Sequence, residues 1–298
     1  MQKKQLAEKI INMYINKWLE RYIEIVNERF IYNEIKEKTL TEYMRSIKKC
    51  SELFGNKLID ELSVKDIATE VSKIINSGRN STAYRFKIHL VDMFREAQHE
   101  GVVVAGHNPA QTVRTPRRKV KTQRLTFEEW KLVLYKAKNI APSYFYLSML
   151  LALLTAQRIT DITRMTHKNI RNEYLYIDQQ KTGVKIAIPL SLRLDLIDIS
   201  LSDVLSMCPR TGSLLQHENG KSVNTWTLSR WFKICRNAAL SKASGLLPPP
   251  FREQRSLAER LYRKQGVDTM ILLGHKHQYT TDNYNDIRNK DYRFLTLK

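Results

Sequence analysis

The chain has 298 residues, of which 50 are Lys or Arg and 30 are Asp or Glu, so its formal net charge is +20. With 42% hydrophobic and 27% charged residues, the composition is that of a globular protein and excludes the fibrous, collagen-like and disordered classes. The longest strongly apolar stretch, residues 144–156, is shorter than the ~20 residues that span a bilayer. No membrane span is therefore predicted.

Three cysteines, Cys50, Cys208 and Cys235, are too few and too scattered for a disulfide framework or a zinc site. The first residues form an amphipathic pattern and not a signal peptide, so we expect a protein of the reducing cytoplasm. The surplus of positive charge favours a polyanionic partner, most often nucleic acid, with a membrane surface as the alternative.

The first third of the chain has the apolar periodicity of helices. Thr39 is the expected N-cap of the second helix, and Ser63 with Asp66 has the pattern of a capping box at the start of the third. The expected helices cover residues 3–30, 40–54, 63–77 and 81–101.

A second domain begins at the capping-box pattern of Thr126 and Glu129. Residues 174–178 and 184–188 alternate as two strands, and the turn between them contains Gly183. The sequence thus predicts a mainly α fold with a small antiparallel β-sheet. Further helices are expected at residues 143–155, 191–207, 224–240, 253–265 and 269–273. We expect a helical domain over 1–112, a linker over 113–124 and a mixed α+β domain over 125–298.

The expected linker is strongly basic, with six basic and no acidic residues within 11 positions. Such a run is either a solvated linker or a strap that lies along a phosphate backbone, and both descriptions can hold together. The candidate DNA-binding residues are Arg114, Arg117, Arg118, Lys119, Lys121 and Arg124.

Several common chemical motifs are absent from the sequence. No GxxxxGK[ST] loop for nucleotide phosphates is present, and neither an HExxH motif, a paired CxxC nor an acidic metal cluster occurs. We therefore predict no metal, no ATP and no other cofactor.

The second domain instead carries a set of cations and one tyrosine in a characteristic order. Arg158 follows an apolar segment with Asp161 three residues later, and Lys181 lies in the predicted hairpin turn. The later members of the set are Arg252, Arg255, His275 in the segment Leu-Leu-Gly-His, and Tyr284 nine residues beyond it. This order resembles that of the tyrosine recombinase (phage integrase) family, and the residues of the motifs are similar to those of lambda-type phage integrases.

The resemblance covers nearly the whole chain and implies the family's two domains. The N-terminal helical domain would bind DNA core sites, and the mixed domain would be catalytic. The small arm-binding domain that precedes these in lambda-type integrases is not expected here. Either the protein works at simple core sites or it is a shortened form. Residues 291–298 are rich in strand formers, so this tail completes its own sheet or pairs with a neighbouring protomer.

The resemblance implies a site-specific recombinase that integrates or excises a phage or mobile element without metal or ATP. Tyr284 would attack the phosphodiester and form a 3′-phosphotyrosyl link. This ester stores the bond energy, so a second 5′-hydroxyl can reverse the step without ATP. Arg158 and Arg255 would grip the non-bridging oxygens through planar guanidinium groups. Lys181 would be the general acid, His275 would donate a hydrogen bond to the phosphate, and Asp161 would orient an active-site side chain.

One departure from the family concerns Arg252, which occupies the place of the usual His of His-x-x-Arg. A guanidinium does not accept a proton near neutral pH, so Arg252 is expected to act as a third phosphate clamp and not as a base. The alternative is a catalytically impaired, DNA-binding relic of a recombinase. Other rivals are a type IB topoisomerase and a nucleic-acid-coating protein.

The expected partners follow from the same resemblance. They are double-stranded DNA core sites and three further copies of the chain, which form a homotetramer on two duplexes. DNA-bending and directionality proteins are further candidates, and the expected location is the cytoplasm of a bacterial host.

Overall fold

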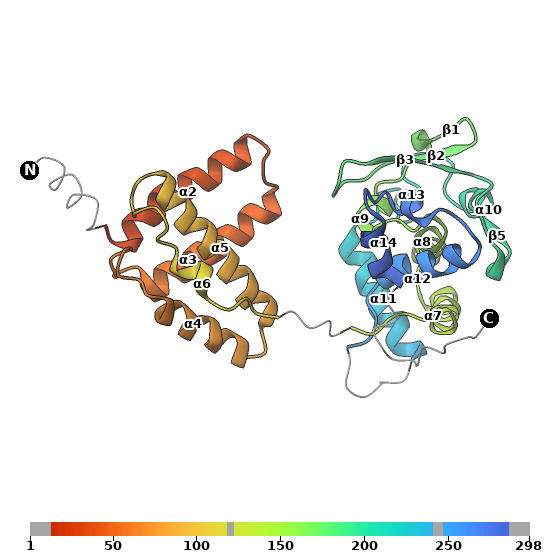
Figure 1. Ribbon diagram of the computed structural model, residues 1–298. Helices are drawn as coiled ribbons and strands as arrows, with labels where there is room; N and C mark the ends of the chain where they lie inside the picture. Colours follow the sequence, from red (N-terminus) through yellow and green to blue (C-terminus); the bar gives the residue numbers. More distant parts are fainter. Residues whose placement is uncertain (1–12, 118–121, 241–246, 286–298) are drawn as a thin grey trace, which may run out of the picture. The chain divides into compact units, whose positions relative to one another are not determined.

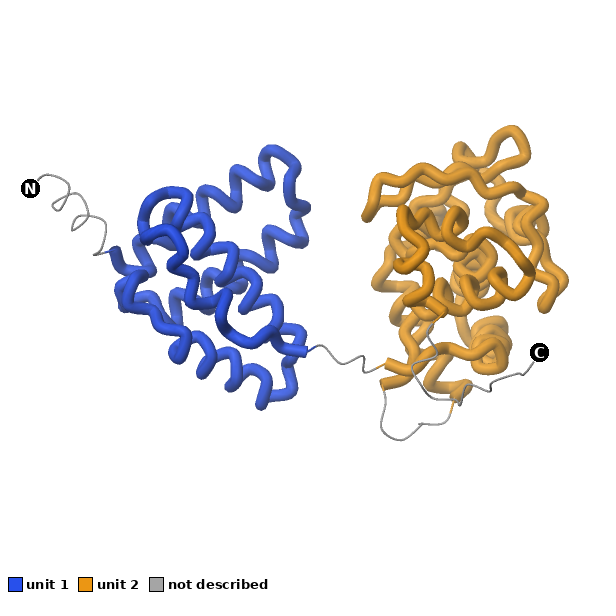
Figure 2. Tube along the Cα trace, viewed as in Figure 1, with its two compact units in different colours: residues 1–120 blue, residues 121–298 orange. Residues whose placement is uncertain are grey.

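The computed structural model of the chain describes residues 13–117, 122–240 and 247–285 (Figure 1). Figure 2 shows the two compact units into which the chain divides, unit 1 over residues 1–120 and unit 2 over residues 121–298. Each unit has its own hydrophobic core. The division falls inside the basic segment 113–124.

Unit 1 is helical. Trp18, Tyr22, Phe86 and Phe94 are among its largest fully buried side chains, and they come from the first and last of its long helices. Its helices are α2 (Ile15–Ile31), α3 (Glu37–Phe54), α4 (Val64–Asn76), α5 (Asn80–His99) and the short α6 (Pro109–Thr112).

The helix starts of unit 1 confirm one predicted cap and correct another. Ser63 and Asp66 form the predicted capping box at α4, with both side chain to backbone hydrogen bonds present. The prediction that Thr39 caps the second helix is wrong, because α3 begins at Glu37 with Lys36 at the N-cap. The carboxylate of Glu37 lies in the first turn, where the helix dipole favours negative charge without a side-chain cap.

A partly buried ion cluster joins α2 and α5. Arg29 hydrogen bonds to Asp92 Oδ2 at 2.8 Å and also to Glu96. The Tyr22 hydroxyl donates to the same Asp92 oxygen at 2.7 Å, and burial together with the Asp92 charge raises the pKa of Tyr22. The positive charge of Arg29 is therefore matched by carboxylates that it contacts directly.

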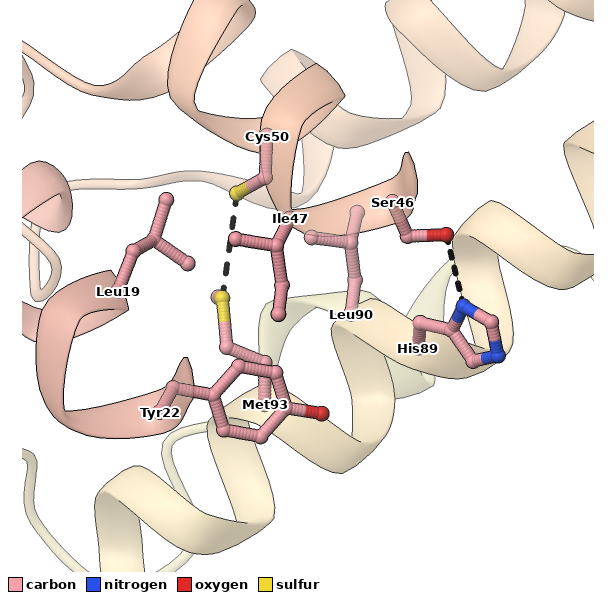
Figure 3. Close-up of a pocket in the computed structure, with 8 residues that line it drawn as sticks. All are labelled: Leu19, Tyr22, Ser46, Ile47, Cys50, His89, Leu90 and Met93. Atoms are coloured by element: carbon pink, nitrogen blue, oxygen red, sulfur yellow. Dashed lines mark hydrogen bonds between the residues drawn. The ribbon is translucent and has the colours of Figure 1, made fainter. Parts of the chain in front are cut away.

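A small cavity lies between α2, α3 and α5 (Figure 3). Its volume is about 10 Å³, which is room for no more than one water molecule. Beside it the sulfur atoms of Cys50 and Met93 lie 3.9 Å apart, and the Ser46 hydroxyl hydrogen bonds to His89 Nδ1 at 2.7 Å. The cavity is thus a packing gap in the core. Its lining residues are Leu19, Tyr22, Ser46, Ile47, Cys50, His89, Leu90 and Met93.

Unit 2 is built around α8 (Ser143–Thr155), a helix buried on almost every side. Because it has no solvent-facing stripe, neighbouring helices must cover it all round. These are α7 (Phe127–Ile140), α10 (Leu201–Ser206), α11 (Thr225–Ala239) and α12 (Glu253–Lys264). Within the described parts of the chain, no helix combines the length and the apolar composition needed to cross a membrane.

Unit 2 also contains a three-stranded antiparallel sheet in the order β1-β2-β3, and Leu175, Ile177 and Ile188 of this sheet belong to the same hydrophobic core. The hairpin of β2 and β3 confirms the predicted pair of strands, with Tyr174 opposite Pro189 and Asp178 opposite Lys185. Gly183 in its turn has φ +70°, the left-handed conformation that glycine adopts without steric cost. The strands are β1 (Ile170–Arg171), preceded by the 3-10 helix η1 (His167–Asn169), β2 (Tyr174–Asp178) and β3 (Lys185–Pro189).

The helix predicted over residues 191–207 is wrong in its first half. A two-stranded hairpin that encloses a short 3-10 helix occupies that region, and the α-helix there, α10, comes only at the end of the segment. Asp198 has φ +54°, which breaks the helical path, and Ser200 with Asp203 then forms a capping box that starts α10. The elements that stand in place of the predicted helix are β4 (Arg193–Leu194), the 3-10 helix η2 (Asp195–Ile197) and β5 (Ile199–Ser200).

Among the short helices of the described part of unit 2, two carry a residue of the predicted site, Asp161 and Tyr284, and a third ends two residues before His275. They are α9 (Ile159–Ile162), α13 (Thr269–Leu273) and α14 (Gln278–Asn285). The mainly α fold with small antiparallel sheets confirms the predicted fold class. The tail at residues 291–298 lies outside the described residues.

Candidate active site

The first arginine of the predicted set is placed by the end of α8. Ala156 follows this helix with φ +54°, a left-handed conformation that L-residues other than glycine adopt at some cost. The chain therefore turns sharply, and Arg158 lies at the N-cap of α9. The side chain of Arg158 is 19% exposed, and its Nη1 donates to Gln179 Oε1 at 2.8 Å.

Arg255 lies in α12 and is almost fully buried, with 4% of its surface exposed. Its Nη1 donates to the carbonyl of Ala156 and its Nη2 to the carbonyl of Leu273, each at 2.7 Å. Within the described residues, no carboxylate hydrogen bonds to this guanidinium, and its Nε has no partner. Arg255 is thus a buried cation held by carbonyl oxygens.

His275 and Tyr284 lie against Arg255. Nη2 of Arg255 is 3.3 Å from His275 Nε2, and its guanidinium carbon is 5.6 Å from the centre of the Tyr284 ring. The rings of His275 and Tyr284 are 5.3 Å apart between centroids. Because arginine only donates, His275 Nε2 accepts, and Nδ1 then carries the proton and donates to Thr281 Oγ1 at 2.9 Å.

The electrostatics follow from this packing of cations. Burial, and next the positive charge of Arg158, lower the pKa of Arg255 to about 10, although Tyr284 and Asp161 partly offset the shift. Burial first, and then Arg255 and Arg158, lower the pKa of His275 to about 4. At neutral pH the site therefore holds two positive guanidinium groups beside a neutral imidazole, an arrangement suited to an anionic ligand.

Lys181 lies on the exposed turn between β2 and β3. The turn begins beside Asp161, whose buried Oδ1 accepts from the backbone N–H of Gln180 at 2.9 Å. Oδ2 of Asp161 is 4.0 Å from Arg158 Nη1. Asp161 therefore lies between the first arginine and the residue that precedes the lysine.

Arg252 is exposed at the N-cap of α12, one helical turn before Arg255. Its backbone carbonyl accepts from the Arg255 N–H at 3.3 Å. Solvent thus reaches its guanidinium, in contrast to the buried guanidinium of Arg255.

Four side chains hold α14, the helix that carries Tyr284. The Ser256 hydroxyl donates to the Tyr284 carbonyl at 2.8 Å, and Arg124 Nη2 donates to the neighbouring Asn283 carbonyl at 2.6 Å. Arg263 pairs with Asp282 at 2.9 Å, and His275 bonds to Thr281. These contacts fix the backbone on which the tyrosine is mounted.

The predicted DNA-binding residues fall into three groups. Arg114 and Arg117 are exposed in unit 1. Arg124 is 14% exposed in its side chain, and its Nη1 also pairs with buried Glu253 at 3.2 Å, so its guanidinium is bound within unit 2. Arg118, Lys119 and Lys121 lie outside the described residues.

The structure also brings in residues that the sequence did not single out. Gln157 and Gln179 are 2% and 1% exposed and connect Arg158 to the segment that ends α13. Thr281 orients His275, and Ser256 holds the Tyr284 backbone. The one signal in the sequence was position, because each glutamine lies within two residues of a predicted site residue.

A model described as the phage integrase family matches residues 123–291. The chain belongs to this family. Prophage integrase IntE of Escherichia coli strain K12 is 41% identical over 290 residues, which cover 94% of this chain and 77% of that protein. The 298-residue chain is therefore a tyrosine-type site-specific recombinase, as the order of its motifs predicted.

Solved structures are similar along the whole chain. A crystal structure of a lambda integrase dimer bound to a COC′ core site matches with a TM-score of 0.90 at 32% identity, covering 100% of this chain and 84% of that one. A lambda integrase tetramer bound to a Holliday junction matches with a TM-score of 0.89 at 32% identity, covering 99% and 84%. The fold and the family thus agree with the predictions.

Proposed function

We propose that this integrase cleaves and rejoins duplex DNA through Tyr284, with Arg158, Arg255, Lys181, His275 and Arg252 around the scissile phosphate. The observation that supports this proposal most directly is that His275 and Tyr284 lie against Arg255, a buried cation with no hydrogen bond to a carboxylate within the described residues. A phosphodiester supplies the negative charge that this set of residues lacks.

In the proposed cleavage step, the Tyr284 hydroxyl releases its proton to solvent as its oxygen bonds to phosphorus, and the bond from phosphorus to the 5′ oxygen breaks. Lys181 gives a proton to the departing 5′ oxygen, and the strand's 3′ phosphate stays on the tyrosine. Attack by a 5′-hydroxyl of a second duplex reverses the step. Because the phosphotyrosyl ester retains the bond energy, no nucleotide hydrolysis is needed.

Arg158 and Arg255 would stabilise the charge that grows on the non-bridging oxygens during both steps. Arg255 makes three hydrogen bonds, to Ala156, Leu273 and His275, which hold the guanidinium in place within the site. Donors held in place before the reaction need no reorganisation when the transition state forms. Arg252, exposed one turn earlier, would add a third positive charge but accepts no proton.

We further propose that unit 1 is the core-site-binding domain, unit 2 the catalytic domain, and the basic segment 113–124, apart from Arg124, a strap on the DNA backbone. The likeness to lambda integrase bound to a core site and to a Holliday junction supports duplex DNA as partner and a tetramer as the working assembly. A bacterial cytoplasm suits an integrase whose relatives come from phages and a prophage.

Covalent trapping on nicked duplexes tests the proposal. Duplexes drawn from the ends of the protein's own genetic element are incubated with the protein, and the products are separated on a denaturing gel. We expect an adduct that maps to Tyr284 and is absent in Tyr284→Phe. Specific binding without an adduct, together with an adduct in Arg252→His, would instead identify a recombinase silenced at position 252.

A further inference from the structure

Gln179 is a buried amide whose four side-chain hydrogen-bonding positions are all occupied. It follows the last residue of β2 and is 1% exposed. Oε1 accepts from Arg158 Nη1 and from Thr182 Oγ1, each at 2.8 Å. Nε2 donates to Gln157 Oε1 at 2.8 Å and to the Leu273 carbonyl at 2.9 Å. Since an amide offers two donors and two lone pairs, the side chain is fully satisfied.

The orientation of this amide is fixed by its partners. Arg158 and Thr182 present donors to one end, and the Leu273 carbonyl presents an acceptor to the other. A flipped amide would place its NH₂ against the guanidinium and its oxygen against the carbonyl, so only one orientation is compatible with the site.

The backbone of Gln179 also fixes the hairpin turn. Its N–H donates to the Val184 carbonyl at 2.9 Å, and its carbonyl accepts from Gly183 N–H at 2.8 Å. Gln179 therefore bonds to three residues of the hairpin turn that carries Lys181. Its side chain contacts Thr182, and its backbone contacts Gly183 and Val184.

The fourth side-chain bond reaches the other half of the site. Leu273 ends α13, and its carbonyl also accepts from Arg255, so Gln179 and Arg255 share one oxygen. The next residue, Gly274, approaches so closely that a Cβ there would lie 2.8 Å from Gln179 Nε2. This close approach, together with φ +62°, requires glycine immediately before His275.

We propose that Gln179 is a positioning residue that fixes the Lys181 hairpin relative to Arg158 and to the turn before His275. The inference rests on the proposed function, in which Lys181 protonates the leaving oxygen while the arginines hold the same phosphate. Gln179 does not itself touch DNA, because it is buried and has no hydrogen bond left to give. Its role is to keep the acid and the clamp in one geometry.

The test compares two cleavable duplexes. One carries the ordinary phosphodiester, and the other carries sulfur in place of the bridging 5′ oxygen. A thiol has a pKa near ~8.5, so a departing sulfur needs no general acid. Sulfur therefore rescues a lost or misplaced acid, whereas it does not rescue a lost phosphate clamp. Lys181→Ala and Arg158→Ala calibrate these two behaviours.

Two variants separate the contacts of Gln179. Thr182→Val removes only the bond from the exposed hairpin to Oε1, and Gln179→Met removes all four side-chain bonds at nearly constant volume. We expect Thr182→Val to slow adduct formation on the ordinary duplex about three- to tenfold, with full rescue by sulfur. Gln179→Met should slow it about 100-fold, with at least tenfold rescue by sulfur.

Unchanged cleavage of the ordinary duplex by Gln179→Met would overturn the inference. Equal losses on both duplexes in Gln179→Met and in Thr182→Val would also overturn it, because the hairpin would then not depend on this amide. Thr182→Val keeps the test valid if Gln179→Met fails to fold. Wild-type protein that forms no adduct, or Lys181→Ala without rescue by sulfur, would refute the proposed function itself and is distinguishable from both results.

Discussion

The two units bury arginines in opposite ways. In unit 1, Arg29 contacts Asp92 and Glu96 directly, and all three side chains are at most one-fifth exposed. In unit 2, Arg255 is 4% exposed and contacts two carbonyl oxygens and a neutral imidazole, while Asp161, whose charge partly offsets that of Arg255, lies 4.0 Å from Arg158. The first charge is compensated within the fold, and the second is not.

This difference separates a structural charge from a functional one. Burying a charge is costly unless it is paired, so an uncompensated buried cation lowers the free energy of unfolding. The lowered pKa values of Arg255 and His275 record that cost. In the proposed function, a bound phosphate would offset this cost, and the affinity for DNA would rise accordingly. Substitution at the two arginines should accordingly have opposite consequences.

The largest expected effect is that of Arg255→Met on chemistry. Removal of a preorganised phosphate donor should slow adduct formation by about 10²–10³-fold. The free energy of unfolding should change by less than about 2 kcal/mol, because two orphaned carbonyls are set against the loss of an unpaired buried charge. Covalent trapping and thermal unfolding measure the two quantities. A loss in cleavage below tenfold would mean that Arg255 is not a phosphate clamp.

Arg29→Met should show the reverse. Two partly buried carboxylates would lose their cation, and since they keep some solvent contact we expect a loss of about 2–3 kcal/mol in unit 1. Hydrogen exchange would detect it as faster opening of α2 and α5, with α8 unchanged. The folded protein should still form the adduct once bound to DNA. Destabilisation confined to unit 2 would contradict the comparison.

Much of the fold could be predicted because it depends on local patterns. The capping boxes at Ser63 and Thr126 and the hairpin with Gly183 each follow from side chains close in sequence, and each is present. The helix predicted over residues 191–207 was wrong in its first half. The apolar spacing there suits a helix, but Asp198 adopts a left-handed conformation that the spacing does not reveal.

The order of the motifs predicted the main residues of the candidate site but not the residues that support them. Arg158, Arg255, His275 and Tyr284 were predicted from their order along the chain, and the structure places His275 and Tyr284 against Arg255. Gln179 was not found, because its partners include the carbonyl of Leu273, and every residue type has a carbonyl. Contacts between a side chain and a distant backbone oxygen leave no trace in sequence.

The structure and the sequence give Arg124 different roles. The sequence predicts a DNA-binding residue of the linker, whereas the structure shows its side chain bonded within unit 2. Its bonds to Glu253 and to the Asn283 carbonyl imply that it holds the tyrosine helix. We expect Arg124→Met to slow adduct formation about tenfold by loosening Tyr284, with an unchanged salt dependence of DNA binding. Exposed Arg117 is the matched control, since Arg117→Ala should reduce the slope of log K against log salt by about 0.9. An equal loss of slope in Arg124→Met would restore it to the DNA-binding strap.

The smallest expected effect is that His275 does not titrate between pH 7.5 and pH 5.5. The pKa of His275 is lowered to about 4, so in the DNA-free protein its ring should stay neutral from pH 7.5 down to pH 5.5. Because the unfolded chain protonates this ring near pH ~6.5, its contribution to stability is complete above that pH and is lost as the pH falls towards 4. NMR titration follows the ring, with His275→Gln to assign its signal and urea-unfolded protein as the reference. A midpoint near 6.5 in the folded protein would show that Arg255 and Arg158 impose no cost on the imidazole, and that the site is not the uncompensated cluster inferred here.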